Sequence, residues 1–218
     1  MQTNQNIADK LLKYSICIDN ARSDRDIQSK LSAFGYTAEK LTIGKTMWEV
    51  CDVLVKTQIK EYGDQFEATN VLNALWKTAE NAYINSLKIA RVAFVDDASA
   101  QAALLLNNKR KDSLSGWLQQ SESFYANLIA SESFKTRMSA YGYTNEKLLA
   151  EQQQITNLKT AKLNQEKEKG QAQQATLNRD KKMDELDAWV SDFIVIARVA
   201  LAETPQYLEK LGILERSE

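Results

Sequence analysis

The sequence predicts an all-α protein in which a helical unit occurs twice and two long antiparallel hairpins form a four-helix bundle. Two features of the composition favour helices. The 218 residues include a single proline, the residue that most often breaks a helix. Charged residues make up 26% and hydrophobic residues 44% of the chain, which is typical of a soluble globular protein. The third observation, an internal repeat, predicts how the helices are organised.

The repeat consists of two segments that return at the same interval. Residues 31–41, LSAFGYTAEKL, return as residues 138–148, MSAYGYTNEKL. The segment IARVA at 89–93 returns unchanged at 196–200, after the same interval as from Leu31 to Met138. Matches at one interval without an insertion indicate a tandem duplication. We therefore expect copy 1 at 1–107 and copy 2 at 108–214, packed as one domain, with a tail at 215–218.

The first copy begins with two helices, expected at 5–21 and 24–34. Gly35 follows the second helix, where a residue in the left-handed conformation commonly ends a helix. Thr37 then caps the next helix, because its hydroxyl can accept from a free backbone N–H in the first turn. Copy 2 repeats both signals, so we expect the same order of helices there.

A long hairpin follows in each copy. In copy 1 we expect helices at 38–62 and 64–94, with a reversal at Gly63, and in copy 2 a matching reversal at Gly170. Two such hairpins predict the four-helix bundle. The apolar stripe fades at 159–182, near the expected tip of the second hairpin. That tip is either a solvated surface against the first hairpin or a projecting finger that awaits a partner.

A short helix ends each copy. Asp97 is the expected cap of the first short helix, and Thr204 caps the second, with Pro205 at its first position. The carboxylates at 180–187 are expected to form a solvated helix face, because lysines lie between them.

Composition also excludes several function classes. The chain has no histidine, which removes imidazole general bases, Ser-His and Cys-His nucleophiles and histidine metal ligands. The 28 Lys and Arg residues balance 29 Asp and Glu residues, so no nucleic-acid partner is expected. No secretory leader and no span for a stable membrane anchor is found, which predicts a cytoplasmic protein. Cys17 and Cys51 are then expected to be buried free thiols.

The candidate site residues are two arginines and two glutamates. Arg91 and Arg198 each place a charge within an apolar IARVA segment, near a helix end where a cation suits the helix dipole. In a hairpin folded at Gly63, Arg91 would lie at the same end as Glu39, and Arg198 would likewise lie near Glu146. These pairs predict struts at the base of each hairpin. The alternative is that the two arginines bind an anion.

No catalytic, cofactor or metal site is predicted, since phosphate loops, Cys-x-x-Cys and nucleophile-elbow motifs are absent. We therefore expect a non-enzymatic structural or interaction protein that binds a protein partner or associates with itself. A carboxylate- and arginine-based ligand binder or enzyme, and a membrane-inserting bundle of long helices, are the alternatives.

Overall fold

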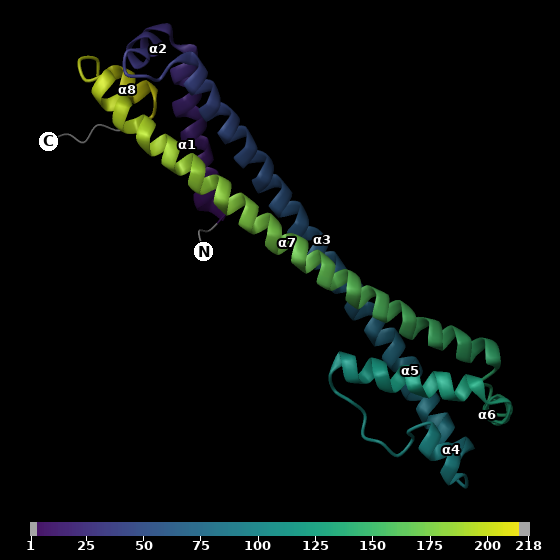
Figure 1. Ribbon diagram of the computed structural model, residues 1–218. Coiled ribbons are helices and arrows are strands. Elements are labelled where there is room, and N and C mark those ends of the chain that lie inside the picture. Colours follow the sequence, from purple (N-terminus) through teal and green to yellow (C-terminus); the bar gives the residue numbers. More distant parts are fainter. Residues whose placement is uncertain (1–3, 214–218) are drawn as a thin grey trace. The chain divides into compact units, whose positions relative to one another are not determined.

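The computed structural model describes residues 4–213, and their side chains from residue 7 onward. These residues form α-helices and no strand (Figure 1), which confirms the all-α prediction. The helices are α1 (Asn4–Ser23), α2 (Arg25–Ser32), α3 (Ala38–Ala93), α4 (Ala98–Ala103), α5 (Leu114–Ala130), α6 (Glu132–Ser139), α7 (Asn145–Ala200) and α8 (Gln206–Lys210). The expected tail at 215–218 lies outside the described residues.

Two helices, α3 and α7, are each 56 residues long and continuous. The predicted reversals at Gly63 and Gly170 are therefore wrong, and the hairpins from which the bundle was predicted do not form. Glycine permits a reversal but does not impose one, and inside a helix it costs only about 1 kcal/mol relative to alanine. Residues 159–182 are accordingly a middle section of α7 rather than a hairpin tip.

The chain forms two compact units whose boundaries differ from those of the two predicted copies. Unit 1 consists of Met1–Tyr62 and Gln171–Glu218, and unit 2 is Gly63–Gly170. The first segment of unit 1, moved forward by the repeat interval, becomes 108–169, and the second segment, moved back by the same interval, becomes 64–111. Together these ranges span unit 2 except for its first and last residues. Each unit therefore combines the first part of one predicted copy with the last part of the other. Residues that lie one repeat interval apart are called equivalent below.

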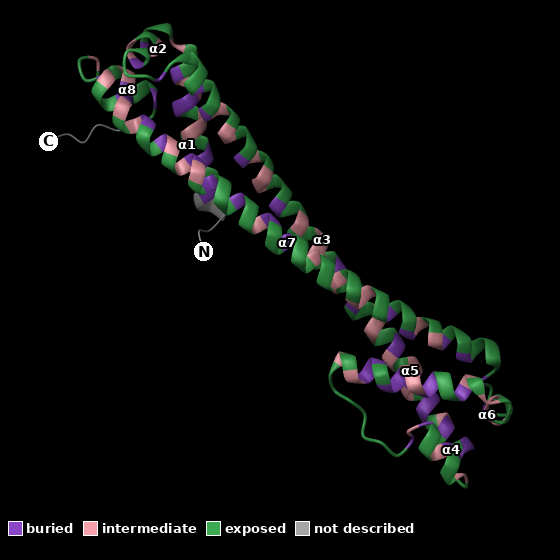
Figure 2. Ribbon diagram, in the orientation of Figure 1, coloured by how far each residue is buried: buried purple, intermediate pink, exposed green. Residues whose placement is uncertain are grey.

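The core of unit 1 forms where α1, α2 and α8 pack on the first half of α3 and the last part of α7 (Figures 1 and 2). An aromatic group lies within this core. The Trp189 ring stacks on Phe193, with 5.5 Å between ring centroids, and meets Tyr36 edge-on at 5.7 Å. Gly44 of α3 lies directly beneath Trp189, since a Cβ atom placed there would be 2.3 Å from the indole.

The core of unit 2 forms where α4, α5 and α6 pack on the second half of α3 and the first part of α7. Its centre is also aromatic. The Tyr83 ring on α3 makes edge contacts with Trp117 at 5.6 Å and with Phe124 at 5.4 Å, both on α5. Phe94, at the end of α3, packs against Phe134 of α6 at 5.1 Å. Aromatic rings therefore join three helices of this unit.

The helix ends follow the sequence signals closely. Gly35 has φ +83°, and the Thr37 hydroxyl accepts from the Lys40 amide at 3.4 Å, so this stop and this cap are confirmed. The Asp97 carboxylate accepts from the Ala100 amide at 2.9 Å, as expected. The expectation for α8 is wrong by one position. Pro205 itself precedes the first helical residue, and no side chain caps that helix.

Both cysteines are buried free thiols, as predicted. Within the described chain, none of the helices carries a stretch long and apolar enough to cross a lipid bilayer.

Candidate functional site

The four predicted site residues are divided between the two units. Glu39 lies in the first turn of α3 and Arg91 in its last turn, so Glu39 belongs to unit 1 and Arg91 to unit 2. Glu146 and Arg198 lie in the first and last turns of α7, in unit 2 and unit 1 respectively. The hairpins that would have brought each pair together are absent. The predicted struts therefore lose the geometry on which they were based.

The two glutamates have a local role at their helix starts. The Thr37 side chain, followed by the backbone, holds the pKa of Glu39 below its ordinary value. The pKa of Glu146 is lowered by the backbone first and by Thr144 second. Both carboxylates thus stabilise the first turn of a long helix, where a negative charge interacts favourably with the helix dipole.

Arg91 has a different contact and lines a groove in unit 2. Its Nε donates to the carbonyl oxygen of Leu106 at 3.0 Å. The groove measures about 320 Å³, and cations and apolar side chains from α3 meet the connector between α4 and α5 there. We call it the basic groove. Its lining residues are Ile84, Leu87, Lys88, Arg91, Lys109, Arg110 and Asp112.

A buried polar cluster lies elsewhere in unit 2. The Glu151 side chain is buried, and its carboxylate accepts from the Ser86 hydroxyl and, at 3.0 Å, from the Tyr125 hydroxyl. Burial, more than the neighbouring carboxylate, raises the pKa of Tyr125. The equivalent residues in unit 1 are apolar or lack a side chain: Phe193, Ile18 and Gly44. The two units therefore fill the same position of the core in different ways.

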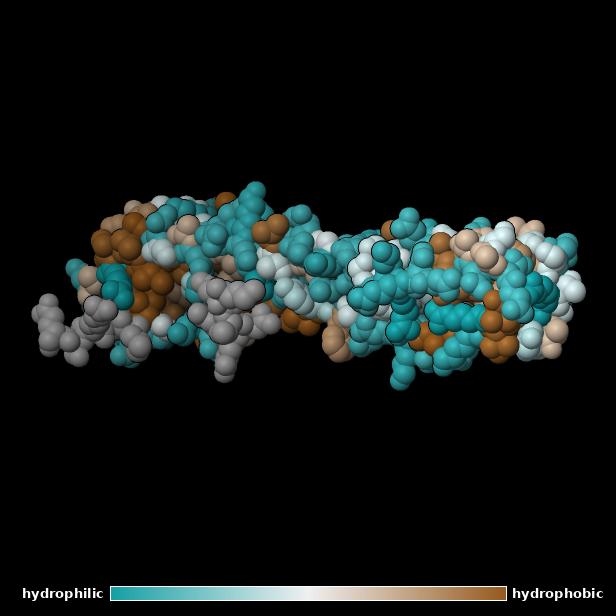
Figure 3. Space-filling model, turned by 90° about the horizontal axis from the view of Figure 1, so that it is seen from below, coloured by the Kyte–Doolittle hydropathy of each residue, from teal (hydrophilic) through white to brown (hydrophobic). Residues whose placement is uncertain are grey.

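Unit 1 has an apolar groove of about 130 Å³ between α3 and α7. It is lined by Thr46, Met47, Val50, Lys182 and Glu185. Val50 is 40% exposed, and Ile43 and Val53 on the same helix are 57% and 59% exposed. On the face shown in Figure 3, hydrophobic residues gather in separate patches among hydrophilic side chains.

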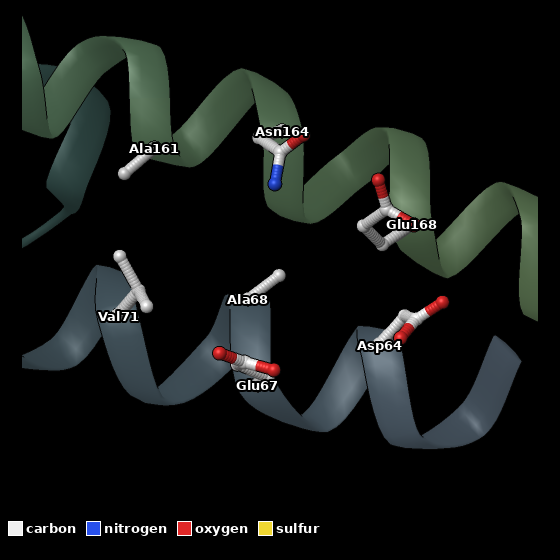
Figure 4. Close-up of a pocket in the computed structure, with 7 residues that line it drawn as sticks. All are labelled: Asp64, Glu67, Ala68, Val71, Ala161, Asn164 and Glu168. Atoms are coloured by element: carbon white, nitrogen blue, oxygen red, sulfur yellow. The ribbon is translucent and has the colours of Figure 1, made fainter. Parts of the chain in front are cut away.

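A third recess, in unit 2, is lined by residues of α3 and α7 and measures about 300 Å³. Figure 4 shows Glu168 of α7 opposite Asp64 of α3, and Ala161 opposite Val71. The remaining lining residues are Glu67, Ala68 and Asn164. Carboxylates in an open recess are common on paired helices, so the recess by itself indicates no ligand.

Other reactive side chains are held in unreactive states or in ion pairs. Burial raises the pKa of the Cys17 thiol to about 12 and that of Cys51 to about 11, so neither forms a thiolate at neutral pH. Asp187 was expected on a solvated face, but its carboxylate accepts from Lys10 Nζ at 2.6 Å and from the Tyr14 hydroxyl at 2.8 Å. That expectation is wrong for Asp187, because periodicity within α7 could not reveal which side chains of α1 cover it.

The chain matches no protein-family model, no curated protein and no solved structure. Its function is therefore inferred from its own residues.

Proposed function

We propose that this chain is a non-enzymatic, tandem-duplicated helical protein that binds a protein partner through an exposed apolar stripe on α3. The stripe consists of Ile43, Met47, Val50 and Val53 in unit 1. The observation that carries the proposal is the difference between this stripe and its equivalent in unit 2.

The duplication is supported by features that return at the repeat interval. Helices α2 and α6 start at Arg25 and Glu132, and α3 and α7 start at Ala38 and Asn145. Among the described residues, the positive φ angles also fall in equivalent pairs, at Gly35 and Gly142 and at Leu105 and Gly212. Lys40 lies 3.9 Å from the Tyr36 ring centroid, and Lys147 lies 3.6 Å from that of Tyr143. Side-chain contacts and backbone angles thus recur together with the sequence.

The four stripe positions recur on one side of α3, because residues three, four and seven apart share a helix face. Their equivalents on α7 are small or polar: Ala150, Gln154, Asn157 and Thr160. The second copy shows that this position in the fold tolerates polar side chains. Met47 packs partly against the core of unit 1, but packing within the chain does not explain the exposed Ile43, Val50 and Val53. An exposed apolar helix face is typical of a surface that receives a partner.

The partner that fits best is an amphipathic helix. The apolar groove beside Met47 and Val50 measures about 130 Å³. Lys182 and Glu185, an ion pair at 2.6 Å, flank it with charges of both signs. An apolar helix face with anchors at the spacing i, i+3, i+4 and i+7 would occupy such a groove. The net charge of −1 favours a protein partner over a nucleic acid, because a nucleic-acid partner requires an excess of cations.

A non-enzymatic role is supported by the absence of histidine from the sequence and by the raised pKa values of both thiols. Two free cysteines also agree with the proposed cytoplasmic location, where thiols stay reduced.

The experiment compares Val50→Glu with Asn157→Glu, which places the same charge at the equivalent position of α7. Both full-length variants are analysed by size-exclusion chromatography with light scattering and by pull-down from the native source. We expect Val50→Glu to abolish a specific association that Asn157→Glu leaves intact. A strictly monomeric chain that retains no partner, or equal loss with both variants, would contradict the proposal.

A further inference from the structure

We propose that the basic groove of unit 2 binds a small phosphorylated organic anion. This site is separate from the apolar stripe on α3 and does not depend on it. Four cations line the groove against a single carboxylate, Asp112. Within the described part of the chain, none of these four cations forms an ion pair with a carboxylate.

The charge in the groove is local. The chain as a whole has a net charge of −1, whereas the lining residues of the groove carry an excess of three positive charges. Lys88 and Arg91 lie about one turn apart on α3, and Lys109 and Arg110 are adjacent in the connector. Like charges gathered in this way repel one another, and a bound anion relieves that repulsion.

Arg91 is oriented for phosphate. Its Nε is already engaged by the Leu106 carbonyl oxygen at 3.0 Å, which fixes the plane of the guanidinium. The two terminal nitrogens can then donate in parallel to two oxygens of one phosphate group, a geometry that lysine cannot offer.

The backbone that supplies the Leu106 carbonyl is strained. Leu105 has φ +54°, a left-handed conformation that costs a non-glycine residue free energy. Its equivalent in unit 1 is Gly212, which has φ +68° without that cost. Copy 1 thus has leucine where copy 2 has glycine, which adopts this conformation without strain. The strained turn at Leu105 lies in the chain between α3 and the cations of the connector.

Two of the four cations, Lys88 and Arg110, are specific to this unit. The equivalent of Arg91 is Arg198, and at both helix ends an arginine interacts favourably with the helix dipole. Arg91 by itself is therefore explained without a ligand. The equivalent of Lys88 is Val195. Lys109 and Arg110 correspond to Gln2 and Thr3 one repeat interval earlier, and to Arg216 and Ser217 one interval later. Lys88 and Arg110 thus have no cationic equivalent, and a purely structural role at the end of a helix would not require them.

The size and walls of the groove indicate the class of ligand. Its volume of about 320 Å³ lies at the lower end of the range for small-molecule sites, roughly 300–1,000 Å³. Ile84 and Leu87 add an apolar wall beside the cations. A phosphate ester with a small apolar or aromatic group would use both surfaces, whereas inorganic phosphate would use only the cations.

The test is isothermal titration calorimetry of the full-length chain with phenyl phosphate, and with inorganic phosphate for comparison. We expect one site, tighter binding of phenyl phosphate, and weakening by about 10- to 100-fold in Arg91→Gln, since a hydrogen-bonded charge pair is lost. Lys109→Gln, a change at an exposed connector residue, is expected to weaken binding as well, and it serves as the test if Arg91→Gln fails to fold. Arg198→Gln, the equivalent change in unit 1, is the control and should bind like the unaltered chain.

Three results would overturn the proposal: no binding of phenyl phosphate, equal weakening in Arg198→Gln, or unchanged affinity in both Arg91→Gln and Lys109→Gln. A parallel titration with phosphatidylglycerol vesicles separates a free phosphate ester from a lipid headgroup. Binding to vesicles without binding of phenyl phosphate would also contradict the proposed ligand.

Discussion

Alanine should have opposite effects at two glycines of the same helix, Gly44 and Gly63. In a helix interior, replacing glycine by alanine ordinarily stabilises by about 1 kcal/mol. At Gly63 a Cβ atom would meet nothing within 4 Å, so the full gain is expected. At Gly44 the same atom would lie 2.3, 2.5 and 2.6 Å from three carbon atoms of the Trp189 indole.

The contact at Gly44 sets the size of the effect. Carbon atoms in contact are ordinarily about 3.5–4.0 Å apart, so the indole would have to move by more than 1 Å. It is stacked on Phe193 and meets Tyr36 edge-on, which opposes that movement. Overpacking of this kind costs about 1–3 kcal/mol, and the restraint on Trp189 places the cost near 3. After the helix gain, Gly44→Ala should destabilise the chain by about 2 kcal/mol.

Urea unfolding followed by circular dichroism at 222 nm measures both variants. The part of the Trp fluorescence that is lost in Trp189→Leu reports on the surroundings of Trp189, one of four tryptophans. The double variant Gly44→Ala with Trp189→Leu should show coupling, because the smaller side chain removes the clash. If Gly44→Ala proved as stable as Gly63→Ala, the close approach of α3 and α7 at Trp189 would be refuted. A large loss in Gly63→Ala would instead restore a turn at that position.

Four further outcomes are expected. Gly212→Ala should lower the free energy of unfolding by about 1–2 kcal/mol, because its φ of +68° strains alanine although the nearest atom, on Ile16, is 3.6 Å away; a neutral effect in urea unfolding would refute this. Tyr125→Phe should cost about 1–3 kcal/mol by removing one of the two hydroxyl donors to a buried carboxylate, and the loss should appear as a lower melting temperature. The N-cap hydrogen bond from the Ile27 amide, followed by the hydrogen bond from Lys210, lowers the pKa of Asp24 below 3.8, so the ionised carboxylate stabilises the fold above that pH. Asp24→Ala should therefore melt at a lower temperature than the unaltered chain near neutral pH. The two melting temperatures should converge as the pH falls through the lowered pKa. Both thiols should react with a thiol reagent at neutral pH only after unfolding, and rapid reaction of the native chain would contradict their burial.

Helix ends could be predicted from the sequence because they depend on few neighbouring residues. Gly35 in the left-handed conformation and Thr37 as a cap need only their own turn of chain, and both are found as expected. The repeat interval likewise follows from comparing the sequence with itself.

The course of the long helices could not be predicted in the same way. Gly63 can adopt either a helical or a turn conformation, and the choice depends on which surface the second half of α3 covers. The two predicted copies are similar in sequence. An apolar stripe on the first half of α3 can therefore pack equally well on the second half of α3, as in a hairpin, or on the last part of α7. Periodicity therefore cannot reveal that the copies exchange their last parts.

The basic groove was only partly accessible to sequence reasoning. Arg91 stands out in the sequence as a charge within an apolar IARVA segment, but the anion site that the sequence predicts as the alternative pairs it with Arg198. Lys109 and Arg110 lie in a connector with no periodicity. They line the same groove as Arg91, and the chain that leads to them passes through Leu105, whose left-handed conformation is uncommon for leucine.

Each compact unit is formed from parts of both predicted copies, and a zero-length carbodiimide cross-link tests this arrangement most directly. In unit 1, Lys10 Nζ of the first copy lies 2.6 Å from the Asp187 carboxylate of the second copy. Without exchange, Lys10 would meet the equivalent residue of its own copy, Glu80. Mass spectrometry of the cross-linked monomer should identify a link between Lys10 and Asp187. A link between Lys10 and Glu80 in its place would contradict the exchanged arrangement.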